Sequence, residues 1–314
     1  MALHSQLAKS IADIGRLMYQ KGWVAANDGN ISVRLDDNSI LCTPTGISKG
    51  MMQPEDMLRC DANGRKLEGL RACTSEIEMH CTIYRLRPDI NAVVHAHPPI
   101  STGFAVAGRA LNLAIIPEAV VTLGTVPLAA YGLPGTPELS ARLAPLIPNH
   151  DAILMANHGA VCYGENLEKA FFRMETVEHL ARISLIAELL GGPRLLARND
   201  VDRLMEARSR YGISFPAGAQ PEAPLAAEED LGRKLLGMLT AEQRKQAVIS
   251  DKAPADVLLM PGRGFDEAPA VGLAASAMTS EQRGVLWELI EEFANNLRKE
   301  LAESELARMR EGGE

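Results

Sequence analysis

Residues 92–97, Ala-Val-Val-His-Ala-His, decide the centre of the fold. Their β-branched and small side chains favour a strand, and the two prolines at 98 and 99 stop it. Because successive side chains of a strand point to opposite faces of a sheet, His95 and His97 leave the same face. Two imidazoles on one face can converge on one metal ion. The segment therefore predicts a strand that carries part of a metal site.

A third histidine, His158, stands in a tight turn. Residues 157–159 read Asn-His-Gly between two apolar segments, 151–155 and 160–163, which we expect to be strands. Three neutral imidazoles suit zinc or a similar divalent ion and leave coordination positions open for substrate, as in catalytic sites. The alternative is that these histidines only pack in the core, and the sequence leaves it open.

Several small polar segments surround this arrangement in the sequence. Glu76 lies at the start of a helix expected over 75–86, where an acidic residue ordinarily just stabilises the helix dipole. The turns 29–32 (Gly-Asn-Ile-Ser) and 43–46 (Thr-Pro-Thr-Gly), with Thr74-Ser75, offer N–H groups and hydroxyls that can hold an anion without a cation. Each is an ordinary turn by itself, and only their convergence would make a phosphate site.

The remaining pattern alternates helices and strands, which predicts an α/β protein. Helical spacing of apolar residues is found over 3–21, 75–86, 99–107, 137–147, 167–190 and 200–210. Strands are expected at 31–35, at 39–43, on both sides of a two-residue Asn63-Gly64 turn and within 120–128.

The order of these motifs, G-N-I-S, T-P-T-G, T-S-E, H-A-H-P and N-H-G, resembles the class II aldolase/adducin family, and within it the L-fuculose-phosphate aldolase-like branch. The resemblance covers roughly residues 5–215. It implies a three-layer α/β/α fold with a central, mostly antiparallel sheet. It also implies a homo-oligomer, with a tetramer favoured and active sites between neighbouring subunits.

The resemblance also implies roles for individual residues. His95, His97 and His158 match the family's zinc ligands, and Glu76 matches its catalytic acid/base. Tyr211 resembles a C-terminal tyrosine that reaches a neighbouring subunit's site. The positions that match the family's phosphate-binding residues are Gly29, Asn30, Thr45, Gly46, Thr74 and Ser75.

The function expected from this match is zinc-dependent cleavage or formation of a carbon–carbon bond in a ketose phosphate, from dihydroxyacetone phosphate and an aldehyde, through an enediolate. Glu118 stands where the fuculose-phosphate enzymes have a tyrosine, which leaves a related lyase (dehydratase or decarboxylase) open. The epimerase branch has aspartate at Glu76 and is disfavoured. A non-catalytic adducin-like scaffold is disfavoured because adducin-type proteins lack the full histidine set, whereas this sequence keeps all three. Schiff-base chemistry is disfavoured because the lysines stand in polar contexts, Lys49 as a solvated loop residue.

Beyond residue 215 no catalytic motif is visible. We expect an aldolase-like domain over 1–215, a Pro/Ala/Glu-rich linker over 216–230 and a helical extension over 231–314. Residues 239–244 (LTAEQR) echo 278–283 (MTSEQR), with Thr279 and Gln282 at capping-box spacing. Two helices that start alike explain the echo more simply than a repeat. The extension faintly resembles a bacterial family of unknown function.

Composition narrows the function classes. The chain has 314 residues, a net charge of −8, no long basic run and only 4% aromatic residues, so we expect no nucleic-acid partner. Long apolar runs and a signal peptide are both absent from the sequence pattern, so no membrane contact is expected. The five cysteines form no C-x-x-C pair and suggest reduced thiols in the cytoplasm. We expect a small-molecule partner, a sugar phosphate or ketol.

Overall fold

The computed structural model describes residues 2–213, 226–248, 272–295 and 299–311 of the chain. It consists of two compact units, Met1–Leu225 and Ala226–Glu314, which are described here one at a time. Within the described ranges, no helix is long and apolar enough to cross a membrane.

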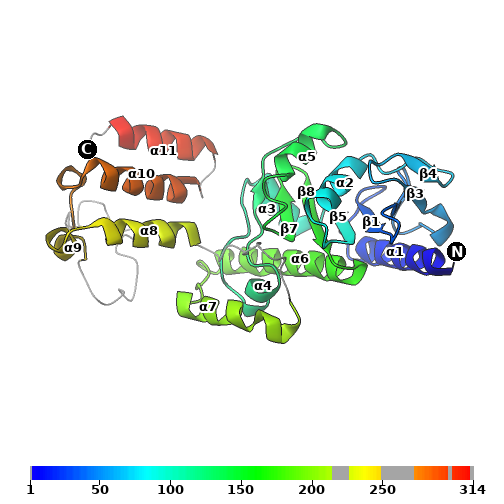
Figure 1. The fold of residues 1–314 in the computed structure, drawn as a ribbon, viewed down its shortest axis with the longest axis horizontal. Helices are drawn as coiled ribbons and strands as arrows, with labels where there is room; N and C mark the ends of the chain where they lie inside the picture. The colour runs from blue at the N-terminus through cyan, green and yellow to red at the C-terminus, as the bar shows by residue number, and fades with distance from the viewer. Residues whose placement is uncertain (1, 214–225, 249–271, 296–298, 312–314) are drawn as a thin grey trace. The chain divides into compact units, whose positions relative to one another are not determined.

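The first unit is built on one eight-stranded sheet in the order β4-β3-β2-β1-β5-β8-β7-β6 (Figure 1). All neighbouring strands run antiparallel except β6 and β7, which are parallel. The expectation of a mostly antiparallel central sheet is therefore confirmed. The strands are β1 Asn30–Arg34, β2 Ile40–Cys42, β3 Leu58–Cys60, β4 Lys66–Glu68, β5 Ala92–Ala96, β6 Leu128–Ala129, β7 Ala152–Met155 and β8 Gly159–Gly164.

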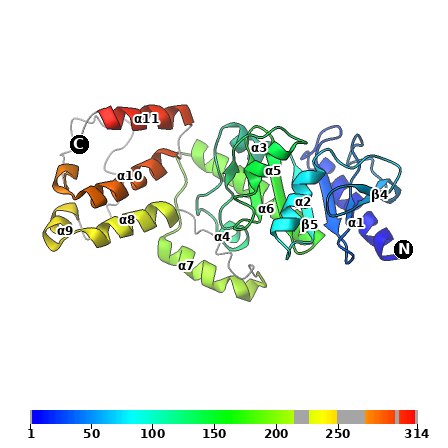
Figure 2. The same ribbon diagram turned by 45° about the horizontal axis from the view of Figure 1, so that its top comes forward.

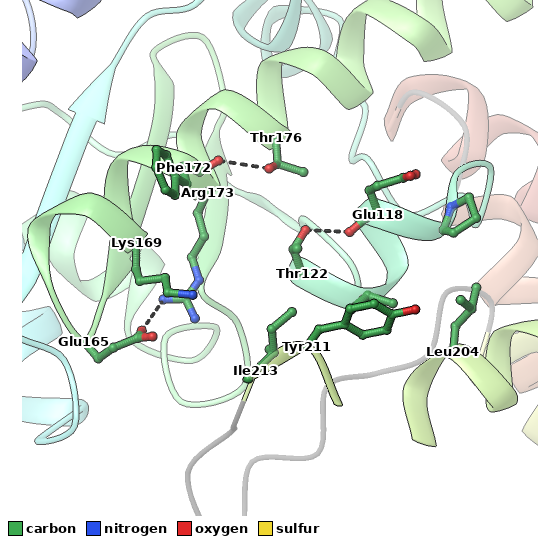
Figure 3. A pocket seen from close by; sticks show the side chains of 13 residues that line it. Glu118, Thr122, Glu165, Lys169, Phe172, Arg173, Thr176, Leu204, Tyr211 and Ile213 are labelled. Atoms are coloured by element: carbon green, nitrogen blue, oxygen red, sulfur yellow. Dashed lines mark hydrogen bonds and ion pairs between the residues drawn. The ribbon is translucent and has the colours of Figure 1, made fainter. Parts of the chain in front are cut away.

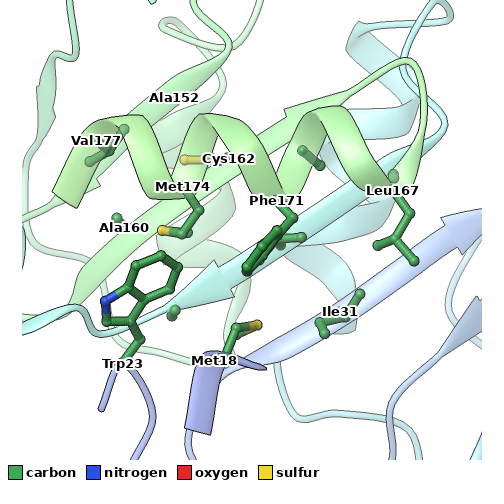
Figure 4. Close-up of a cluster of buried hydrophobic side chains, with 14 of the residues drawn as sticks. Met18, Trp23, Ile31, Ala152, Ala160, Cys162, Leu167, Phe171, Met174 and Val177 are labelled. Carbon is green, nitrogen blue, oxygen red and sulfur yellow. The ribbon is translucent and has the colours of Figure 1, made fainter. Parts of the chain in front are cut away.

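Helices cover both faces of the sheet and complete three layers (Figures 1 and 2). One face packs against α1 (Ala2–Gln20), α3 (Pro99–Val106) and α6 (Leu167–Leu189), in a core that holds Trp23 and Phe171 (Figure 4). The other face packs against α2 (Ile77–Leu86) and α5 (Pro137–Leu143). In β5, Ala92, Val94 and Ala96 belong to the first core and Val93 to the second. His95 shares the parity of Val93 and so faces the α2 side.

Two local predictions were wrong. Residues 117–122 form helix α4 (Pro117–Thr122) and not part of a strand over 120–128. Pro117 at the first helical position explains this, because its fixed φ and missing N–H suit a helix start. The β3–β4 connection spans residues 61–65 and not two residues, because the Asp61 carboxylate accepts the backbone N–H groups of Asn63 and Arg65.

The chain leaves the sheet through α7 (Arg198–Ala207) and a short 3-10 helix, η2 (Arg208–Tyr211). Val201 of α7 packs on Val120 of α4 and on Ala114 in a third, small core. Another 3-10 turn, η1 (Pro54–Asp56), lies between β2 and β3.

The second unit contains α8 (Ala226–Met238), α9 (Ala241–Ala247), η4 (Ala275–Ala277), α10 (Ser280–Asn295) and α11 (Lys299–Glu311). Helix α8 starts inside the predicted linker 216–230, whose residues 216–225 lie outside the described part. Helix α10 packs against both α8 and α11. The unit is helical, as expected.

The sequence echo in this unit corresponds to two capping boxes that face each other. Thr240 and Gln243 cap α9, and Thr279 and Gln282 cap α10 in the same way. The two glutamine amides then bond to each other reciprocally, at 3.1 and 3.0 Å. Each also donates to the carbonyl two residues before the other threonine, Ala277 at 2.8 Å and Met238 at 2.7 Å. The echo thus encodes a symmetric contact, which similar helix starts by themselves do not require.

Candidate active site

Three histidine rings meet at the end of the central strands, on the α2 side of the sheet. His95 and His97 come from the end of β5, and His158 from the turn between β7 and β8. The ring centroids are 4.8 to 5.1 Å apart, and the ligand atoms of all three lie within 4.8 Å of one another. The Nε2 atoms of His95 and His97 are 3.2 Å apart. Two nitrogens on a tetrahedral zinc, each at about 2.1 Å, would be about 3.4 Å apart.

The outer contacts of these rings fix which nitrogen faces the centre. His95 Nδ1 donates to the Ala160 carbonyl at 2.9 Å, and His97 Nδ1 lies 3.4 Å from the Asp28 carboxylate. Both leave Nε2 for a metal, the arrangement that metal-binding histidines usually adopt. Burial, followed by the charge of His95, lowers the pKa of His97 to about 4 and that of His158 to about 3. Neutral imidazole is the form that binds a metal.

Glu76 completes the cluster from the N-cap position of α2. Its Oε2 lies 3.2 Å from His95 Nε2 and its Oε1 lies 3.3 Å from His158 Nε2. Burial by itself raises the pKa of Glu76, but the positive charge of His95 and a hydrogen bond outweigh it, and the pKa falls well below its usual range. A carboxylate among three imidazoles needs one positive charge near it. A divalent cation supplies such a charge and therefore fits this donor set. One further observation is that the buried Nδ1 atom of His158 has no hydrogen-bond partner.

A buried chain of hydrogen bonds holds Glu76 from behind. Asn30 Nδ2 donates to Glu76 Oε2 at 2.8 Å, and Asn30 Oδ1 lies 2.5 Å from His80 Nε2. Since an amide oxygen only accepts, His80 carries its proton on Nε2 and accepts at Nδ1 from Ser32 Oγ, 2.7 Å away. Ser32 then accepts from the Tyr84 hydroxyl at 2.7 Å. Every donor in this chain points toward the carboxylate.

The sequence did not predict this series of hydrogen bonds. His80 lies four residues after Glu76 on the same helix, and the structure links the two side chains through Asn30. Asn30 was assigned only to phosphate, whereas its buried side chain is occupied by Glu76 and His80. The i, i+4 spacing was the available signal. The partner on β1 could not be seen because it depends on how β1 pairs with β5.

The segments assigned to phosphate lie next to one another. Pro44 pairs with Cys73 in an isolated bridge, and Thr45 N donates to Ala72 O at 3.1 Å, so the 43–46 turn lies against the 72–75 segment. Asn30 joins the third turn to them through Glu76. Gly29 (φ +70°) must be glycine, because a Cβ there would lie 2.8 Å from the His95 carbonyl oxygen. Thr45 and Gly46 are exposed at the surface and Thr74 is buried.

Glu118 and Tyr211 lie elsewhere in the unit. Both line a cavity of about 340 Å³ between α4, α6 and η2, with Lys169, Phe172 and Leu204 also on its wall (Figure 3). The cavity wall does not include the three histidines or Glu76. Within one chain, therefore, these two predicted catalytic residues lie together but apart from the histidine cluster.

Lys49 is not the solvated loop lysine that the sequence suggested. It is 1% exposed, and its Nζ donates to the carbonyls of Asn27 and Ile47, both at 3.1 Å. Burial lowers the pKa of Lys49 to about 8. A lysine so enclosed, with two carbonyl partners, has no open side for a ketone. It ties the loop after the 43–46 turn to the loop before β1.

The α/β fold and the cluster of three histidines and one glutamate together define a protein of the class II aldolase type. The model of the Class II Aldolase and Adducin N-terminal domain family matches residues 9–185, more than half of the chain. The chain belongs to this family, as the motif order implied. Residues 216–312 match a second family, described as a protein of unknown function (DUF3500).

Two relatives of known name each match a little over half of this chain. The chain is 36% identical over 173 residues to the L-fuculose phosphate aldolase of Methanococcus maripaludis, covering 55% of this chain and 93% of the relative. It is 34% identical over 188 residues to the 3-oxo-tetronate 4-phosphate decarboxylase of Escherichia coli, covering 59% and 88%. The solved structure of YgbL from Escherichia coli, titled a putative aldolase/epimerase/decarboxylase, superimposes with a TM-score of 0.60 at 31% identity, covering 65% and 99%.

Proposed function

We propose that this protein is a zinc-dependent class II aldolase that cleaves or forms the carbon–carbon bond beside the ketone of a ketose phosphate. The observation that carries the proposal is the convergence of His95, His97, His158 and Glu76 on one point. The family and the named aldolase relative support it.

The residues of the site have separate roles, which follow from their positions. The three imidazoles would hold the ion, which supplies Lewis-acid stabilisation of negative charge on the substrate's oxygens. Glu76 is ionised at neutral pH, as its lowered pKa requires, and can move the proton at the enediolate carbon. The Asn30–His80 chain fixes the carboxylate's orientation. The N–H groups and hydroxyls of the 29–30, 45–46 and 74–75 segments would anchor the phosphate and so orient the reacting carbons.

A second candidate, decarboxylation of a phosphorylated 3-oxo acid, is favoured by a specific observation. One named relative is a 3-oxo-tetronate 4-phosphate decarboxylase. The family resemblance also implies that Glu118 stands where the fuculose-phosphate enzymes have a tyrosine. Loss of CO₂ beside a ketone leaves the same kind of enediolate as aldol cleavage. The histidine cluster and Glu76 therefore serve either reaction, and the residues that face the departing group decide between them.

The separation of Glu118 and Tyr211 from the histidine cluster supports a site shared between subunits. We infer a homo-oligomer, with a tetramer favoured, in which one subunit's cavity wall faces its neighbour's metal site. Glu118 and Tyr211 would then act on the leaving group of the neighbour's substrate. We place this enzyme in the cytoplasm, with a small-molecule sugar phosphate or ketol as its substrate.

The reaction is tested with the zinc-loaded full chain and a panel of substrates. Dihydroxyacetone phosphate is offered with various aldehydes, and 3-oxo-tetronate 4-phosphate is offered alone, for wild type, Glu76→Gln and Glu118→Gln. Aldehyde-dependent consumption of dihydroxyacetone phosphate supports the aldolase, and release of CO₂ supports the second candidate. Glu76→Gln should lose at least about a hundredfold in either reaction. Full activity of that variant would remove Glu76 from the mechanism.

Subunit mixing tests the shared site. Glu76→Gln and Tyr211→Phe subunits, each nearly inactive alone, are unfolded, mixed in equal amounts and refolded together. If each site combines two neighbours, about one site in four becomes intact, and activity returns to about a quarter of wild type. No recovery, with oligomers of mixed composition verified by mass, would show that each site belongs to one chain.

A further inference from the structure

Three cysteines that the proposed reaction does not use lie together on the α2 side of the sheet. Cys42 ends β2 and Cys60 ends β3, and the register of these strands (Ile40 opposite Cys60, Cys42 opposite Leu58) sets both on one face. Cys73 joins them from the segment that leads to α2, held there by its bridge to Pro44. The three Sγ atoms lie within 4.8 Å of one another.

The distances between the three sulfur atoms match those between ligands of one metal ion and not the length of a disulfide bond. Cys42 Sγ and Cys60 Sγ are 4.0 Å apart, and all the cysteines in the described part are free thiols. Three sulfurs at about 2.3 Å from a central ion in one plane are about 4.0 Å apart. The set therefore has the size of a three-thiolate metal site without any movement of the strands.

The surroundings suit a soft cation. Cys42 and Cys60 are fully buried among apolar side chains such as Leu58 and Met79, while Cys73 is partly exposed and offers a route in. Their own polar contacts are weak sulfur contacts, Cys60 to the Ile40 carbonyl at 3.6 Å and Cys73 to the Gly64 carbonyl at 3.8 Å. Thiolate ligands select soft ions such as Cu(I), or zinc, over magnesium and calcium.

From this geometry we infer that Cys42, Cys60 and Cys73 form a second metal site, which binds one soft, thiophilic cation through three sulfurs. It is separate from the histidine cluster in both ligands and chemistry.

The site has a consequence for the neighbouring loops. Cys42 runs directly into the 43–46 turn, and Cys73 runs directly into Thr74, Ser75 and Glu76. An ion bound to both cysteines would link the segments assigned to phosphate and would change substrate binding. This consequence rests on the proposed function, whereas binding of the ion does not.

The test uses Cd²⁺ added to the zinc-loaded full chain under reducing conditions, with the thiolate-to-metal charge-transfer absorbance as readout. Histidine ligands give no such band, so zinc exchange at the other site does not interfere. We expect the band to saturate at about one Cd²⁺ per chain. In Cys73→Ser and in Cys42→Ala the band should fall at least about tenfold at the same Cd²⁺ concentration. X-ray absorption should report three sulfur neighbours.

Cys162→Ala is the matched control, because Cys162 is equally buried but belongs to the core on the opposite face. It should keep the wild-type band. Cys73→Ser changes only a partly exposed side chain, so its fold is expected to persist, and circular dichroism checks it. A wild type without the band, or a band that survives in Cys73→Ser, would overturn the site. Missing enzyme activity with an intact band would instead count against the proposed function alone.

Discussion

Acid should destabilise this protein through His80, because its ring is fully buried behind Glu76. Burial, followed by the charge of His95, lowers the pKa of His80 from 6.5 to about 3. Between about pH 6.5 and pH 3, His80 therefore binds a proton in the unfolded chain but not in the folded protein. Stability from this group is fully present above pH 6.5 and is lost as the pH falls from 6.5 toward 3.

The size of the effect follows from the two pKa values. Between pH 7 and pH 5 the unfolded chain gains about three quarters of a proton at this position, and the folded chain gains almost none. The difference amounts to about 2 kcal/mol of unfolding free energy, since one pKa unit corresponds to about 1.4 kcal/mol. Other groups also titrate in this range, so the change in wild type by itself does not isolate His80.

A double difference isolates it. The free energy of unfolding in urea is measured at pH 7 and pH 5 for wild type and for His80→Gln, and the pH effect of the variant is subtracted from that of wild type. We expect the loss of unfolding free energy between pH 7 and pH 5 to be about 2 kcal/mol larger in wild type than in His80→Gln. His179→Gln, which removes an exposed histidine from α6, should leave almost nothing after the same subtraction. A remainder for His80 below about 0.5 kcal/mol would refute the reasoning.

Two further predictions concern close contacts. Gly159→Ala would place a Cβ 2.5 Å from Cδ2 of His97, so the ring must move and zinc affinity should fall at least about tenfold in a competition titration; Gly103→Ala, where the Cβ meets nothing within 4 Å, should keep wild-type affinity. Gln243→Leu and Gln282→Leu should each destabilise the second unit by about 1–3 kcal/mol in thermal unfolding. Because each leaves the other amide without its partner, the double variant should lose clearly less than the sum, and strict additivity would contradict the reciprocal contact.

The sequence by itself determined the elements that depend on local pattern. The period of two in 92–97 placed His95 and His97 on one face, and the turn around His158 was visible from Asn157 and Gly159. The helices at 77–86 and 167–189 followed from apolar periodicity. The T-x-x-Q spacing at Thr279 predicted the capping box that the structure contains.

Two predictions from the sequence were wrong because they relied on local pattern, whereas the surrounding structure decides the outcome at these positions. Val120 and Val121 suggested a strand because they are β-branched, yet Pro117 starts a helix there and Val120 packs on α7. Lys49 looked solvated because its neighbours in sequence are polar. The fold encloses it between two loops, and two carbonyls replace the water that it loses.

Only the tertiary structure decided how separate segments meet. The pairing of β1 with β5 and the packing of α2 set Asn30 between Glu76 and His80. The register of β2 with β3 gathered the thiols of Cys42 and Cys60. Such contacts join residues that are far apart in the chain, and neither local propensity nor periodicity specifies strand order or register. The sequence therefore singled out His95, His97 and His158 as candidate metal ligands, while the fold decided what orients them and which other groups lie beside them.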